Sequence, residues 1–246
     1  MQEYQQAFSL AQDSETRAVA LLGIGQTNYL MKNYSGAIEA LSSIIEVYSE
    51  GYHIPKTYFY LAQSFSALED YMQAAVYYAG FLEVYSGVLE SFVNELLGDA
   101  LLLTGNFDGA ISAFQESIAK SVTGDAINAE RKLGQAYLEM EDYENAVRIF
   151  MGLYERTDND YIKAEMNWLA GQAYLAMEIP EQAYARFQDS IQNYPISYDS
   201  YLGLVALVNA NQPVNDLDRG LVNYFVDQYG LALDAFNQYL KDYPEH

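Results

Sequence analysis

Few side chains in this sequence have the type and spacing that catalysis or metal binding requires. The chain of 246 residues has two histidines, His53 and His246, and neither has a cysteine or a second histidine one helical turn away. Because a zinc site takes three or four such ligands, the histidines do not indicate a metal site. The absence of cysteine excludes disulfides and thiolate chemistry, and it leaves the compartment open.

The segment Asp158-Asn159-Asp160 imitates the start of a calcium-binding loop. Such a loop needs glycine at its sixth position and a bidentate acid at its end, but the sixth residue here is Lys163 and no acid follows in register. An acidic cluster at a helix N-terminus explains the segment better. Glycine-rich nucleotide loops and the nucleophile-elbow pattern are absent from the sequence. We therefore expect no metal and no cofactor.

Two Glu-Ser pairs, Glu90-Ser91 and Glu116-Ser117, are the remaining candidates for acid–base chemistry. A Glu-Ser pair belongs to the signature of lytic transglycosylases, but that signature continues with a Gly-Leu-Met-Gln segment that this chain lacks. Carboxylates are frequent in so acidic a chain, so two neighbouring acids do not identify an acid–base couple. We interpret both pairs as structural, and we expect that the chain has no catalytic residues and is not an enzyme.

The charge balance limits the kind of partner. Twelve Lys and Arg residues against 34 Asp and Glu residues give a formal net charge of -22, which repels phosphate backbones and argues against nucleic acid. The acidity serves solubility or indicates a basic partner. No apolar run approaches the roughly 18 residues of a membrane span, and the sequence as written starts without a signal peptide.

The elements that position these side chains follow from an internal repeat. A small residue recurs six times at intervals of 37, 36, 36, 37 and 49 residues, and an alanine follows each one after twelve residues. The first column consists of Gly25, Ala62, Gly98, Gly134, Gly171 and Gly220, and the second of Ala37, Ala74, Ala110, Ala146, Ala183 and Ala232. Two columns that agree across six copies indicate a repeat protein.

Each copy is predicted to form two helices. Between the two columns stands an Asn or Asp followed by an aromatic residue, as in Asn33-Tyr34 and Asp142-Tyr143, and such side chains accept the free N–H groups at a helix start. The fifth copy has Ile179-Pro180 instead, and proline suits a first helical turn. Small residues let the paired helices approach closely, and large residues four positions after the alanine fill the space beside them.

This pattern resembles the tetratricopeptide repeat. The fourth copy matches with Leu133-Gly134, Tyr137, Ala146 and Phe150. The period is longer than the family's usual 34 residues, and most copies lack the closing proline. The resemblance implies an all-α fold, a right-handed superhelix (α-solenoid) of antiparallel helix pairs, in one domain over residues 1–246. We expect pairs at about 14–49, 55–86, 91–121, 125–156, 160–194 and 213–243.

The longer last interval predicts an extra helix at about 198–210, ended by Gln212-Pro213. At the start, Tyr4 to Phe8 is similar to the second helix of a pair without its first, and the end at Tyr243 to His246 lacks a polar capping helix. Repeat arrays normally carry caps at both ends. We therefore expect the chain to be a piece of a longer protein.

In tetratricopeptide arrays the first helix of each pair lines a concave groove. Placed on this sequence, the resemblance gives a groove of amides and aromatic residues, suited to peptide or sugar, although glutamine is also an ordinary residue on a solvated helix face. The expected groove residues are Gln26, Tyr29, Phe59, Gln63, Glu95, Asp99, Arg131, Gln135, Trp168, Gln172 and Tyr224. The Lys/Asn clamp of chaperone-binding members is not matched. The groove acids, which also include Glu139 and Glu165, favour a neutral or basic ligand.

The segment from Tyr194 through Arg219 to Tyr224 looks like the repeat region before the catalytic domain of some bacterial soluble lytic murein transglycosylases. The strings that carry this likeness form helices and are not catalytic motifs. We therefore expect a protein–protein interaction scaffold, with a peptidoglycan-binding module of a cell-wall enzyme as the alternative. That alternative implies a periplasmic or extracytoplasmic location, and otherwise the chain is expected in the cytoplasm. Self-assembly is a third possibility.

Overall fold

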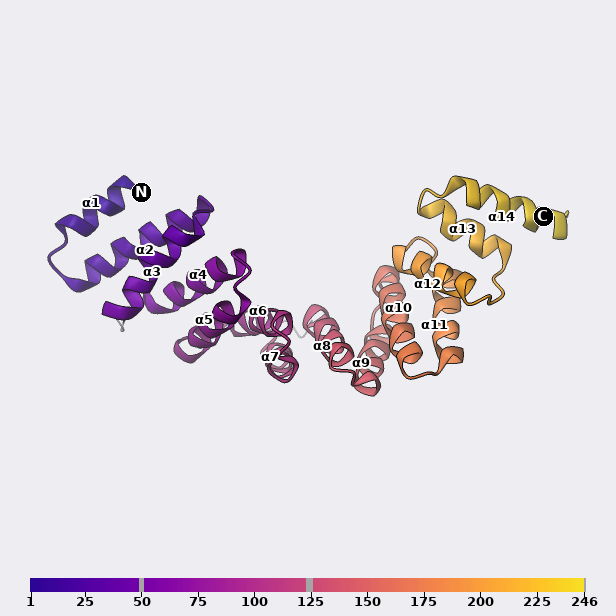
Figure 1. Ribbon diagram of the computed structural model, residues 1–246, viewed down its shortest axis with the longest axis horizontal. Helices are drawn as coiled ribbons and strands as arrows, with labels where there is room; N and C mark the ends of the chain where they lie inside the picture. Colours follow the sequence, from indigo (N-terminus) through magenta and orange to yellow (C-terminus); the bar gives the residue numbers. More distant parts are fainter. Residues whose placement is uncertain (49–50, 123–125, 246) are drawn as a thin grey trace. The chain divides into compact units, whose positions relative to one another are not determined.

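The structure is a computed structural model that describes residues 1–48, 51–122 and 126–245. The expected pair limits at 49 and 125, and His246, lie outside the described residues. The chain divides into two compact units, Met1–Lys132 and Leu133–His246. Within the described residues all regular structure is helical, which confirms the predicted all-α class (Figure 1). The single domain over 1–246 stays a prediction.

The first unit begins with one helix and continues with antiparallel helix pairs, α2 with α3, α4 with α5 and α6 with α7. Helix α1 also packs against α2, α3 against α4, and α5 against α6. The helices are α1 (Gln2–Leu10), α2 (Ser14–Leu30), α3 (Tyr34–Val47), α4 (Ile54–Ala67), α5 (Tyr71–Val84), α6 (Glu90–Leu103), α7 (Phe107–Ala119) and α8 (Ile127–Glu139), whose last residues belong to the second unit.

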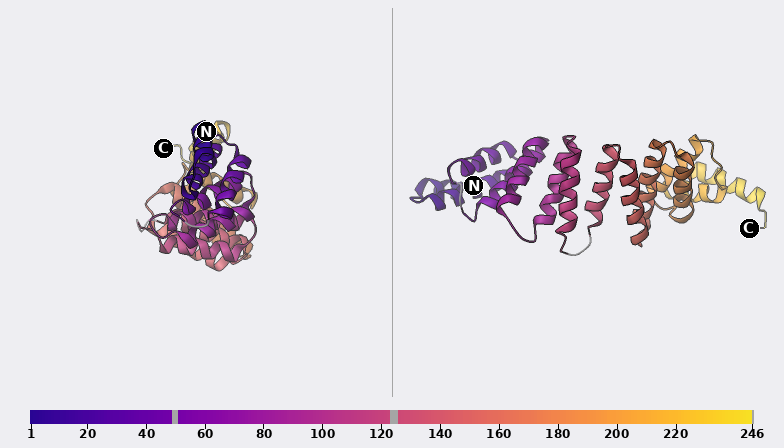
Figure 2. Two further views of the ribbon diagram at one scale, coloured as in Figure 1. Left: turned by 90° about the vertical axis from the view of Figure 1, so that its left-hand side faces the viewer. Right: turned by 90° about the horizontal axis from the view of Figure 1, so that it is seen from below.

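In the second unit α10 packs against both α9 and α11, and α13 pairs with α14. Helix α12 lies where the sequence contains the additional residues, and it packs against α10 and α11 before the last pair begins. The helices are α9 (Tyr143–Arg156), α10 (Asp160–Ala176), α11 (Pro180–Asn193), α12 (Tyr198–Asn209), α13 (Asp216–Phe225) and α14 (Tyr229–Asp242). Figure 2 shows the helices from two further sides.

The turn inside each pair has the same backbone geometry in all six copies. One residue has a positive φ, and the next residue's N–H donates to the carbonyl five positions back, as Asp142 does to Tyr137 at 2.9 Å. Four of the turns then use an Asn or Asp side chain as the N-cap, so that Asp142 accepts from the Asn145 N–H at 3.2 Å. These caps satisfy N–H groups that the second helix leaves unpaired.

The core of each pair lies between the small residue of its first helix and a large residue of its second helix. Phe114, Phe150 and Phe187 are fully buried, and a Cβ added at Gly98, Gly134 or Gly171 would clash with the corresponding ring. The glycines therefore set how closely the paired helices approach. No helix of the described residues is long and apolar enough to cross a membrane.

Candidate functional site

Side chains from three helices of the first unit form a continuous set of hydrogen bonds. The Tyr29 hydroxyl on α2 donates to Gln63 Oε1 on α4 at 3.3 Å, and Gln63 Nε2 donates to the Tyr78 hydroxyl on α5 at 2.8 Å. Ser66 Oγ lies 3.4 Å from the same hydroxyl. Two predicted groove residues, Tyr29 and Gln63, are thus brought together, and their hydrogen bonds join consecutive repeats.

Tyr78 is the buried member of this set. Its side chain is almost fully enclosed, and this burial raises the pKa of Tyr78 to about 12, although the Ser66 hydrogen bond opposes the shift. A phenol that stays neutral can both donate and accept. Gln63 is therefore held in a fixed orientation by tyrosines on either side of it.

Lys132 on α8 neutralises two of the predicted groove acids. Its Nζ lies 2.7 Å from Glu95 Oε1 and 2.6 Å from Asp99 Oδ2, both on α6, and the lysine side chain is only 21 % exposed. Burial raises the pKa of Asp99 above its ordinary value, and the Lys132 ammonium opposes that rise. Because both carboxylates are paired, their charge is less available to a basic ligand than the sequence suggested.

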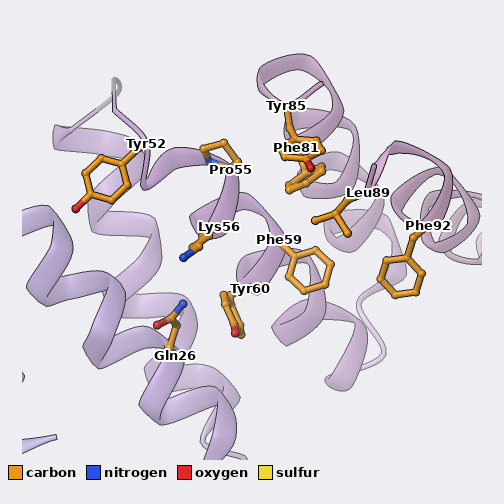
Figure 3. A pocket seen from close by; sticks show the side chains of 10 residues that line it. All are labelled: Gln26, Tyr52, Pro55, Lys56, Phe59, Tyr60, Phe81, Tyr85, Leu89 and Phe92. Atoms are coloured by element: carbon orange, nitrogen blue, oxygen red, sulfur yellow. The ribbon is translucent and has the colours of Figure 1, made fainter. Parts of the chain in front are cut away.

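An open cavity of about 400 Å³ lies beside these helices (Figure 3). It is formed by α2, by the start of α4 and the residues before it, by the end of α5, and by the start of α6. The lining residues are Gln26, Tyr52, Pro55, Lys56, Phe59, Tyr60, Phe81, Tyr85, Leu89 and Phe92. Its volume falls in the range of ordinary ligand sites. Of the predicted groove residues, Gln26 and Phe59 line it.

The other predicted groove residues are not among those that line this cavity. Arg131 is half-buried on α8. In the second unit, Gln135 on α8 is half-buried, Gln172 on α10 is exposed, and Tyr224 on α13 is exposed and packs edge-on against Phe225 and Tyr229. The half-buried Trp168 ring lies 5.4 Å from the Phe187 ring and packs against the core of the second unit. Trp168 thus has a packing role.

The residues first considered for chemistry have structural surroundings. Glu90 accepts from the Gly87 N–H at 2.8 Å and pairs with Lys120 at 3.0 Å, and the Lys120 ammonium lowers the pKa of Glu90. Ser91 Oγ donates to the Ser117 carbonyl at 2.8 Å. Asn159 caps α10 by accepting from two N–H groups. These contacts agree with the structural interpretation of the segments.

His53 is buried, with 2 % exposed, at the start of α4, and its ring packs edge-on against Tyr52. Its two ring nitrogens have no hydrogen-bond partner among the described residues. Over the same part of the chain, no group of three or more His, Cys, Asp or Glu residues is arranged to hold a metal ion.

A second polar cluster, in the second unit, was not predicted. Asp189 on α11 accepts from the Tyr154 hydroxyl at 2.8 Å and from Asn167 Nδ2 at 2.7 Å, and the Tyr154 and Tyr194 hydroxyls lie 3.0 Å apart. Lys163 Nζ lies 5.7 Å from the centre of the Tyr154 ring, and burial raises the pKa of Tyr154. The cluster joins α9, α10 and α11.

Sequence reasoning missed Lys132 and most of the cavity. Lys132 follows Glu95 by 37 residues, one repeat period, so a search for opposite charges one period apart would have found the pair. The aromatic residues at the end of α5 and the start of α6 had no such signal, because their meeting depends on the geometry of the connection between two pairs.

Two segments of the chain match family profiles, residues 60–126 and residues 19–50, and both profiles are described as tetratricopeptide repeat. A search among curated protein sequences finds no significant match. The family matches and the fold together confirm the resemblance to tetratricopeptide-repeat proteins.

Solved structures share the fold. YrrB, described as a TPR protein with an unusual peptide-binding site, is 17 % identical, with a TM-score of 0.63 over 82 % of this chain and 96 % of that chain. MamA from Desulfovibrio magneticus RS-1 is 16 % identical, with a TM-score of 0.57 over 74 % of this chain and 96 % of that chain. At these identities the likeness concerns the fold alone.

Proposed function

Because the chain carries tetratricopeptide repeats, we propose that it is a non-catalytic interaction scaffold that binds a peptide or protein partner along the first helices of its pairs. In the first unit, the binding surface is formed by α2, α4 and α6. The observation that carries the proposal is the open aromatic cavity beside α2 and α4, next to side chains already oriented by hydrogen bonds. Pre-oriented side chains lose less entropy when a ligand binds.

The kind of ligand follows from the side chains available. Gln26 supplies an amide that both donates and accepts, as a peptide backbone requires, and the aromatic rings supply apolar contact area. YrrB, which shares the fold, is described as having a peptide-binding site. That description supports a peptide as the class of ligand, but it does not indicate where on this chain the peptide binds.

A site-specific photo-crosslink tests the proposal. A benzoylphenylalanine placed at Gln26 should give discrete adducts with a partner in a native extract, and the same group at Glu46, exposed on the second helix of the first pair, should not. Equal crosslinking at both positions, or none at Gln26, would count against binding at the first helices.

Peptidoglycan binding is the second candidate, because aromatic rings such as Tyr52 and Tyr85 at the cavity can stack on sugars as well as on peptide groups. Sedimentation with purified peptidoglycan distinguishes peptidoglycan binding from binding of a peptide or protein partner. Retention of the chain in the pellet, reversed by a Tyr52→Ser substitution, would favour the glycan. Release of soluble glycan fragments by the chain alone would overturn the non-catalytic assignment.

A further inference from the structure

The cavity in the first unit has two ends of different polarity. The rings of Phe59 and Phe92 and the side chain of Leu89 lie at one end, whereas the amide of Gln26 and the ammonium of Lys56 lie at the other (Figure 3). The rim stays accessible to solvent, since Phe92 is 51 % and Tyr52 is 68 % exposed. A ligand that fills this cavity therefore has an apolar part and, at a short distance from it, a polar part.

Lys56 is the charged residue among those that line the cavity, and it forms no ion pair with any described residue. The ammonium groups of Lys120 and Lys132, elsewhere in the first unit, are already paired with carboxylates. Among the described residues, the polar end thus offers a cation and an amide and no carboxylate. It matches a negatively charged group.

The net charge of -22 repels acidic ligands at long range. At physiological ionic strength, however, exposed charges are screened beyond about 8 Å. For a ligand bound in the cavity, the charge that matters most is therefore the nearest one, which among the described lining residues is that of Lys56. The overall acidity therefore slows the approach of an acidic ligand more than it weakens the bound state.

We infer that the cavity binds a peptide segment in which a large apolar side chain lies next to an acidic side chain. The apolar side chain packs against Phe59, Leu89 and Phe92, and the carboxylate accepts hydrogen bonds from Lys56 and Gln26. This inference rests on the proposed function and specifies the ligand of the same surface. A free fatty acid fits less well, because ligand sites normally enclose most of a small ligand and this rim is open.

A library of synthetic nonapeptides with acetylated and amidated ends tests the inference, because blocked ends remove the terminal carboxylate. Selected peptides should be enriched in Phe, Leu or Trp beside Asp or Glu. For the best such peptide, Lys56→Glu should weaken binding about fivefold or more, since it removes an ion pair and adds repulsion. Phe92→Ser should weaken it about tenfold through lost apolar contact.

The matched control is Lys32→Glu, which makes the same charge change at an exposed position in the first unit away from the cavity, and it should leave the affinity unchanged. Lys56 and Phe92 are exposed, so both variants should keep the helical circular dichroism of the wild type. Selected peptides without acids, or equal affinity for Lys56→Glu, would overturn the inference and leave the scaffold proposal standing. A library with no binders would count against both. Tighter binding of dodecanoate than of any blocked peptide would show that the ligand class is wrong.

Discussion

Gly134 on α8 lies directly against the ring of Phe150 on α9, sixteen residues later in the chain. The ring is fully buried, and no side chain at position 134 fits without displacing it. The same separation recurs in every copy of the repeat. The equivalent pairs are Gly25 with Leu41, Ala62 with Tyr78, Gly98 with Phe114, Gly171 with Phe187 and Gly220 with Phe236.

A methyl group at this position should destabilise the fold. We expect Gly134→Ala to lower the free energy of unfolding by about 1–2 kcal/mol, because overpacking against Phe150 outweighs the better helix propensity of alanine. The control is Gly152→Ala on α9, where an added Cβ meets no atom within 4 Å. That variant should be more stable by about 0.5–1 kcal/mol. Urea denaturation followed by circular dichroism measures both, and equal effects would contradict this explanation of the glycine column.

At the turn positions with positive φ, glycine should be more favourable than the non-glycine residue now present. Glu141 has a φ of 65°, a conformation that costs a residue with a Cβ about 1 kcal/mol. We therefore expect Glu141→Gly to raise the midpoint of thermal unfolding. Glu144→Gly, three residues later in the first turn of α9, should lower it, because glycine is unfavourable within a helix. If both variants lower the midpoint, the turn geometry does not limit stability.

Lys132 should contribute to stability through the two carboxylates that it neutralises. We expect Lys132→Met to cost about 1–3 kcal/mol near pH 7, because it leaves Glu95 and Asp99 close together and partly buried. Burial already raises the pKa of Asp99, and removal of the cation raises it further. A carboxyl group whose pKa is raised in the folded state destabilises the fold when it is ionised and not when it is protonated. The stability cost of Lys132→Met should therefore shrink as the pH falls through the range in which the carboxyl groups titrate.

Lys120→Met is the matched control, since it removes an ion pair in which the lysine is half-exposed. Its effect on urea denaturation at pH 7 should be much smaller than that of Lys132→Met. A cost of Lys132→Met that stays constant from pH 7 to pH 4 would show that the lysine stabilises the fold by packing alone.

Tyr78 should make the stability fall in alkaline solution. Its pKa of about 12 in the folded chain lies above the value near 10 of an unfolded tyrosine. Its contribution is therefore fully present below pH 10 and is lost as the pH rises toward 12. We expect Tyr78→Phe to be less stable than the wild type by about 1–2 kcal/mol at pH 8, through the lost hydrogen bond with Gln63. The difference in unfolding free energy between the wild type and Tyr78→Phe should narrow by about 1 kcal/mol at pH 11. Urea denaturation of both proteins at pH 8 and pH 11 measures this difference. A larger difference at pH 11 than at pH 8 would contradict the explanation by a buried phenol.

In the second unit, substitution of Trp168 should affect stability, whereas substitution of Gln172 should affect partner binding alone. Trp168→Ala should cost about 3 kcal/mol, because its ring packs against Phe187 in the core. Gln172→Ala, at an exposed position one turn later on α10, should leave the unfolding midpoint unchanged and weaken partner binding if α10 contributes to the groove. Thermal unfolding and the crosslinking yield measure the two effects. Unchanged binding by Gln172→Ala would exclude Gln172 from the binding surface.

The sequence by itself determined the helix pairs, because the information for them is local. A small residue, a turn with an Asn or Asp cap, and a large residue sixteen positions after the small one all fall within one copy, so self-comparison reveals them. Only the tertiary structure decided which groove residues are available to a ligand. Lys132 reaches Glu95 and Asp99 across successive pairs, and the cavity beside Lys56 forms where parts of three pairs meet. Such contacts depend on how one pair packs on the next, and no spacing within a single copy encodes that packing.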